Sequence, residues 1–162
     1  MRVYKIQNVK DMMAKILMQD CFDDFLVSEI KILGKANLFL TGSPAEGFFP
    51  AKELDESGYI PYATVRSLCF DMIKGEKQPE SFTFMFLLSR EKVEALLDEC
   101  DSTLQPSDVE SLSFLVRFKG GELTVTTGSA LKIFTMDKSL NIAWEKWVEN
   151  YLTTLQIGFD EI

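Results

Sequence analysis

Hydrophobic positions recur along the chain with two different periods. After Asn8, a favourable N-cap residue, apolar side chains follow every three or four positions as far as Leu17, which predicts a helix. Similar stripes predict a second helix from Pro61, a third after Ser89 and a fourth that Gly158 ends. The pattern therefore predicts four helices separated by segments of a different character.

Strands are expected where apolar residues alternate with polar ones or form short continuous runs. The clearest pair flanks the turn at 119–122 and predicts a hairpin. Residues 82–88 are so apolar that both faces of that strand are expected to be covered. The strand around residue 30 should carry a register break near Glu29. The expected strands are Val3–Ile6, 25–33, 38–40, 82–88, 112–118, 123–127 and 131–135.

The order of these elements sets the expected fold class. Hairpin connections outnumber crossover connections, which favours an α+β fold with antiparallel sheets over a doubly wound parallel sheet. The length of 162 residues is typical of one domain, so the whole of 1–162 is expected to form a single core.

A long segment between 42 and 60 breaks both periods. Gly, Pro, Ser and Glu dominate it, which predicts a loop, with a short strand at Phe48 and Phe49 as one option. Together with Tyr59 and Tyr62, these two phenylalanines form the best candidate for an exposed apolar patch that binds a partner. The alternative is that the loop folds back and its rings fill the core.

The two halves of the chain share a spacing. The tripeptide Thr-Gly-Ser at 41–43 recurs at 127–129, and residues 1–49 and 80–135 both read as a strand, a helix and two or three strands. In element order, this duplicated βαβββ unit resembles a single domain of the DNA sliding clamps. The resemblance implies a clamp-like fold, from which the chain departs by two additional helices, one of them before Gly75.

Four short segments carry a second resemblance. They are Asn-Val-Lys-Asp at 8–11, Ile-Lys-Gly-Glu-Lys at 73–77, Thr-Thr-Gly at 126–128 and Asp-Lys-Ser-Leu at 137–140. They are similar to an uncharacterised family of clostridial proteins of unknown function. This resemblance implies no catalytic or binding residue, because none is established for that family.

Candidate chemistry is sparse. The chain contains no histidine, which removes the commonest general base and imidazole metal ligands and argues against an enzyme. Cys69 lies on an apolar stripe, and acidic neighbours of Cys21 and Cys100 oppose thiolate formation. No carboxylate cluster follows a calcium-loop spacing, and the Gly-rich turns lack a phosphate-loop ending. The sequence predicts neither a cofactor nor a metal site.

The net charge limits the expected binding partners, and the cysteine content indicates the cellular compartment. The formal net charge is −8, so nucleic acid and anionic membrane surfaces are unfavourable partners. The odd cysteine count, the lack of an N-terminal signal peptide and the lack of a long apolar run favour a cytoplasmic protein without a membrane segment.

These observations lead to an expectation about function. The chain is expected to be a non-enzymatic, clamp-like interaction module that binds a protein partner or a second copy of itself. Two alternatives stay open: a small-ligand-binding protein or histidine-free enzyme with a pocket between sheet and helices, and an oligomeric relative of the DNA clamps.

Overall fold

The chain folds into seven strands, four α-helices and three short 3-10 helices. The computed structural model describes residues 1–162. The strands are β1 (Val3–Ile6), β2 (Leu26–Leu33), β3 (Asn37–Thr41), β4 (Ser81–Leu87), β5 (Val109–Lys119), β6 (Glu122–Leu131) and β7 (Phe159–Glu161). The helices are α1 (Val9–Leu17), α2 (Arg66–Ile73), α3 (Arg90–Glu99) and α4 (Ser139–Thr154), with 3-10 helices η1 (Ala51–Glu53), η2 (Tyr62–Thr64) and η3 (Pro106–Asp108).

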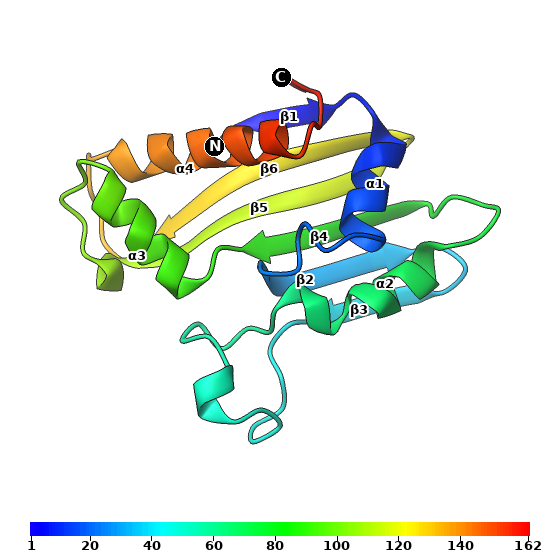
Figure 1. Cartoon of the computed structure of the whole chain (residues 1–162), viewed down its shortest axis with the longest axis horizontal. Coiled ribbons are helices and arrows are strands. Elements are labelled where there is room, and N and C mark those ends of the chain that lie inside the picture. Colours follow the sequence, from blue (N-terminus) through cyan, green and yellow to red (C-terminus); the bar gives the residue numbers. More distant parts are fainter.

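All seven strands belong to one sheet in the order β3-β2-β4-β5-β6-β1-β7. Every neighbouring pair is antiparallel. The helices lie on the face of the sheet that is nearer the viewer in Figure 1. This arrangement confirms the predicted α+β class and its antiparallel sheet.

Helix starts follow the caps that the sequence indicates. The side chain of Asn8 accepts a hydrogen bond from the backbone amide of Asp11 at 3.0 Å. Ser89 does the same for the amide of Lys92 at 3.4 Å. Each cap satisfies one of the amides that have no partner within the first turn of a helix. The register break expected near Glu29 is also confirmed, as an irregularity in the pairing of β2 with β4.

The core lies between the sheet and the helices. Alternate residues of the interior strand β4, namely Phe82, Phe84 and Phe86, are buried on the helix side, and the rings of successive members contact each other. The intervening Thr83 and Met85 are only half-buried. The prediction that both faces of this strand are covered is therefore wrong, because only one side of the sheet carries helices.

Three local predictions are also wrong. Residues 131–135 do not form a separate strand, because β6 continues to Leu131 before the chain bends. Phe48 and Phe49 lie in turns and bends outside any strand. Pro61 does not begin the second helix directly, because it precedes η2, and α2 starts only at Arg66.

The two halves that share a Thr-Gly-Ser spacing occupy different positions in the sheet. In the second half, β4 pairs with β5, which is the strand that follows it in the sequence. In the first half, β1 does not pair with β2 but lies between β6 and β7. Because equivalent strands have different neighbours, the duplication of 1–49 and 80–135 is not confirmed.

No helix in the structure combines the length and apolar character needed to span a membrane.

Candidate functional site

A long loop projects beyond the β3 edge of the sheet. This projecting loop (residues 43–59) follows β3 and extends below it in Figure 1. Its two ends are held together, since the amide of Ile60 donates to the carbonyl of Gly42 at 2.9 Å. The amide of Val27 in β2 then donates to the carbonyl of Ile60, also at 2.9 Å. The loop is therefore attached to the sheet at its base.

Close backbone packing explains the glycine at this base. A Cβ atom placed on Gly42 would lie 1.6 Å from the carbonyl oxygen of Val27. No side chain can occupy that space, so a residue with a Cβ would force the loop away from β2. The glycine of the first Thr-Gly-Ser tripeptide thus has a packing role.

A second attachment joins the projecting loop to α3. The carboxylate of Asp55 accepts hydrogen bonds from the amides of Ser57 at 2.9 Å and Arg90 at 3.1 Å. Arg90 also donates from its guanidinium to the carbonyls of Pro106 at 2.7 Å and Val109 at 2.8 Å. Asp55 thereby connects the loop to the first turn of α3, and the side chain of Arg90 connects that turn to the start of β5.

The loop presents a pair of aromatic rings. Phe48 is 75% exposed, and Phe49 beside it is half-buried. Their ring centroids are 5.4 Å apart in an edge-to-face arrangement. Neither ring belongs to the hydrophobic core or to the half-buried residues that pack against it. Tyr59, near the far end of the loop, is half-buried and likewise lies outside the core.

Tyr62 does not belong to this surface. Its side chain is fully buried, with its ring 5.1 Å from Phe86 and 5.9 Å from Phe84 in edge-to-face contacts. Burial raises the pKa of its phenol above the usual value. The sequence-based assignment of Tyr62 to an exposed patch is therefore wrong, because the chain re-enters the core directly after Pro61.

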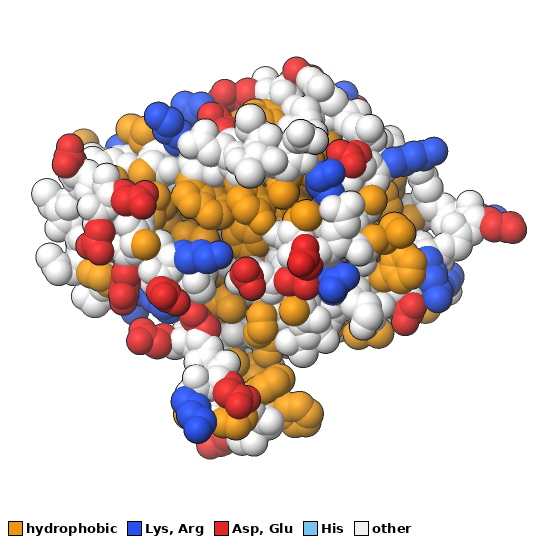
Figure 2. Space-filling view, in the orientation of Figure 1, with side chains coloured by type: hydrophobic (Ala, Val, Ile, Leu, Met, Phe, Trp, Pro, Cys, Tyr) orange, Lys and Arg blue, Asp and Glu red, His pale blue; other side chains and the backbone are white.

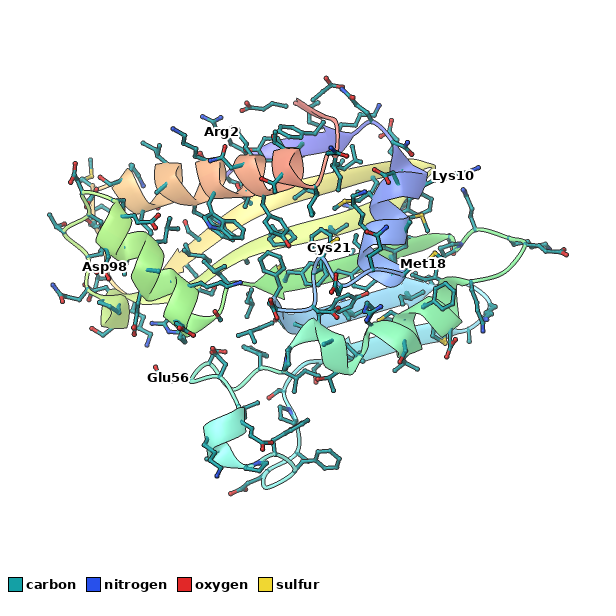
Figure 3. All side chains as sticks on the ribbon, in the orientation of Figure 1. Arg2, Lys10, Met18, Cys21, Glu56 and Asp98 are labelled. Carbon is teal, nitrogen blue, oxygen red and sulfur yellow. The ribbon has the colours of Figure 1, made fainter.

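Charged side chains surround the aromatic pair. The projecting loop contains four acidic residues and one lysine. Glu46, Glu53 and Glu56 are exposed and make no ion pair. Figure 2 shows hydrophobic, acidic and basic side chains side by side on this projection, and Figure 3 places Glu56 on it. An apolar centre with a charged rim is typical of protein interaction sites.

A lysine-rich hollow lies at the opposite end of β3. This lysine hollow, lined by residues 34–35 and 72–80, has a volume of about 630 Å³. Its lining carries three lysines and two glutamates, Glu76 and Glu80. Lys35 and Lys77 are exposed and make no ion pair, whereas Nζ of Lys74 lies 3.2 Å from a carboxylate oxygen of Asp71. A smaller hollow of about 270 Å³ adjoins it and is lined by Phe70, among others.

A second apolar surface was not found from the sequence. Phe134 is 90% exposed in the connection between β6 and α4, and Met136 and Ile142 are exposed nearby in the chain. The connection is fixed by Asp137, whose carboxylate accepts hydrogen bonds from the amides of Thr103 and Ser139. Hydrogen bonds from Ser139 and Thr103 hold the pKa of Asp137 well below its usual range. Phe134 lies in the segment 131–135 that was predicted to be a strand, so its exposure was not expected.

The aromatic row on α4 is part of the core margin. Trp144 is buried, while Trp147 and Tyr151 are half-buried and stack at 5.3 and 5.2 Å along the helix. Hydrophobic side chains are visible between the helices in Figure 2. The hydroxyl of Tyr151 donates to the carbonyl of Cys21, and burial raises the pKa of Tyr151 to about 12. These contacts agree with a packing role for the row.

The cysteines and acids do not assemble into a reactive centre. Cys69 is fully buried, and burial raises the pKa of its thiol to about 12, which disfavours the thiolate. Cys21 and Cys100 are half-exposed and free. No group of three or more His, Cys, Asp or Glu side chains is placed to hold a metal ion.

The fold and its surfaces describe an antiparallel α+β protein with an anchored aromatic loop. The chain belongs to the family of unknown function DUF5721, which matches residues 15–160. This membership confirms the expected relationship to an uncharacterised family. No curated protein and no solved structure matches the chain.

Proposed function

We propose that the chain is an interaction module that binds a protein partner through the projecting loop. The observation that carries the proposal is the exposure of Phe48 on a loop whose base and middle are both fixed to the fold. A large ring held in solvent by a fixed backbone loses little conformational freedom on binding, so its burial contributes mainly to affinity. Phe48 and Phe49 would form the buried centre, and Glu46 and Glu53 the charged rim.

A core role for Phe48 and Phe49 would be recognised by its effect on folding stability. A core phenylalanine replaced by alanine costs about 3–5 kcal/mol of folding stability. Phe49 packs against Phe48 and outside the core, so Phe49→Ala should lower stability by less than about 1 kcal/mol. Phe86→Ala, in the middle of the core, is the matched control and should show the large loss.

The test is partner capture by the tagged chain in cells, followed by affinity measurement with the purified partner. Phe48→Ala and Phe49→Ala should weaken binding by about tenfold or more while leaving the urea-unfolding midpoint near that of the wild type. Phe134→Ala, at the other exposed apolar surface, should leave the affinity unchanged. Equal affinity of the wild type and both loop variants for every purified partner would refute the proposal.

A further inference from the structure

The two edges of the sheet differ in how they are protected. β7 closes one edge with only three residues, two of which are the acidic Asp160 and Glu161. β3 forms the other edge with five residues, Asn37–Thr41, and contains neither a charged residue nor a proline. Short length and charge are the usual devices that stop an edge strand from pairing with another chain. β3 has none of these devices.

The side chains of β3 also favour contact. Leu38 and Leu40 pack against the core on the helix side. Phe39 points to the opposite face beside its pairing partner Lys31 and is 66% exposed. Because β3 has no charged residue, pairing with a second copy of β3 places no like charges opposite each other.

We propose that β3 pairs antiparallel with β3 of a second copy of this chain, around a twofold axis at Phe39. This inference rests on the proposed function of the projecting loop, because the second copy is the partner to which that loop binds. Twofold pairing makes a closed dimer in which the same surface of both copies is used. The two sheets then join into one, with the helices of both copies on the same side.

The axis at Phe39 determines what meets at the ends of the strand. In an antiparallel pair centred on this residue, Thr41 of one copy lies opposite Asn37 of the other. The projecting loop begins two residues after Thr41, and the turn that contains Lys35 comes directly before Asn37. Each loop is therefore brought to the lysine hollow of the other copy, and the contact occurs twice in the dimer.

The charges at these two places are complementary. The loop, with four acidic residues and Lys52, carries a net charge of −3, and the lining of the hollow, with three lysines and two glutamates, carries a net charge of +1. Glu46, Glu53 and Glu56 on the loop lack ion-pair partners within the chain, as do Lys35 and Lys77 at the hollow. Opposite local charges of this kind orient association. The hollow, at about 630 Å³, is also large enough to receive an aromatic side chain such as Phe48.

Interface size supports the contribution of the loop. Stable specific interfaces bury about 1,200–2,000 Å² in total. A pair of five-residue strands at a sheet edge supplies only part of this area. Two loops, each packed on the other copy, add the remaining surface and place aromatic rings in it.

A charge-swap experiment tests the arrangement. One variant combines Glu46→Lys with Glu53→Lys, and the other combines Lys35→Glu with Lys77→Glu. Sedimentation velocity should show that the wild type is a dimer. For each variant alone, the dissociation constant of the dimer should be about tenfold higher or more, because each change acts at two symmetric contacts. Mixing the two variants should restore dimers, since each loop then meets a hollow of opposite charge. Glu94→Lys with Asp98→Lys on α3 is the matched control and should dimerise as the wild type does.

Cross-linking tests the axis. In a background with Cys21→Ser and Cys100→Ser, Phe39→Cys should form a disulfide-linked dimer on mild oxidation. Residues that face each other on an antiparallel twofold axis have Cα atoms about 4.5–5.5 Å apart, within the range of a disulfide. Lys119→Cys, exposed on the same face but in β5, should not cross-link.

The outcomes separate this inference from the proposed function. A wild-type chain that sediments as a monomer, or charge-swapped variants that dimerise like the wild type, would overturn the dimer. If the monomer still binds a different protein through Phe48, the interaction function stands and the second copy is excluded as its partner. If the dimer forms but Phe48→Ala leaves it unchanged, the loop has no part in it and the inference fails.

Discussion

The carboxylate of Asp55 and the backbone amide of Arg90 are joined by a hydrogen bond of 3.1 Å. Asp55 belongs to the projecting loop, and Arg90 is the first residue of α3. The first amides of a helix have no partner within the helix, so this contact satisfies one of them with a charged acceptor. A distant loop thus contributes to the cap of a core helix, in addition to the local cap Ser89.

Removal of this contact should cost stability. We expect Asp55→Ala to lower the free energy of unfolding by about 1 kcal/mol, as other helix-cap deletions do. Glu56→Ala, next to it in the loop and without an ion pair, should change stability by less than about 0.5 kcal/mol. Urea unfolding followed by circular dichroism measures both. Equal midpoints for the two variants would mean that the loop is not held by Asp55.

The glycine at the base of the loop gives a second prediction. Gly42→Ala should lower stability by about 3 kcal/mol, because its methyl group would overlap the carbonyl oxygen of Val27 and force β2 and the loop apart. Gly47→Ala is the control. Gly47 has a φ of 77° with open space around it, so only the left-handed backbone conformation is penalised, at about 1–2 kcal/mol. Thermal unfolding of both variants gives the comparison, and a smaller loss for Gly42→Ala would contradict the packing argument.

Stability should decrease as the pH rises above about 9. Burial raises the pKa of the Cys69 thiol from 9.0 to about 12, so the folded chain retains a proton that the unfolded chain releases. The stabilisation is complete below the unfolded pKa and is lost as the pH rises towards the folded pKa. The loss is at most about 1.4 kcal/mol per pH unit for one group. Urea unfolding across this window measures the slope.

The contribution of Cys69 can be separated from that of the tyrosines. Burial also raises the pKa of Tyr151, from 10.0 to about 12, so its effect begins at a higher pH. Cys69→Ala should therefore flatten the slope mainly between about pH 9 and 10. Ile73→Val removes a buried methyl group from the same helix without an ionisable group, and it should lower stability at every pH with the slope retained. An unchanged slope in Cys69→Ala would contradict the assignment.

Local signals in the sequence predicted most of the fold. The caps Asn8 and Ser89 identified two helices, and the Gly-Gly turn identified the β5–β6 hairpin, because each of these features is determined by residues close together in the chain. β7 was missed, since its three residues are ordered only by pairing with β1. The order of the strands in the sheet could not be predicted from the sequence, because it depends on contacts between segments that are far apart in the chain.

The candidate site was predicted only in part. Gly, Pro and acidic residues located the loop, and the structure places Phe48 in solvent there. Tyr62 was misassigned, because the point at which a chain re-enters the core leaves no periodic signal. The tie between Asp55 and Arg90 could not be read from the sequence either, as the two residues are far apart in the chain. The sequence also did not show that β3 is an edge strand, because this follows only from the order of the strands in the sheet.

The position of β1 between β6 and β7 has a consequence for biosynthesis. Val3 pairs with Thr126, and Ile6 pairs with Phe159, so β1 is synthesised long before its partners in the sheet. At about 5–20 residues per second, β1 waits several seconds or longer for a neighbour. Tyr4 and Ile6, which end fully or almost fully buried, remain unshielded in the nascent chain for that time. Completion of the sheet is therefore a late, non-local event, and folding should be slower than local helix formation would allow.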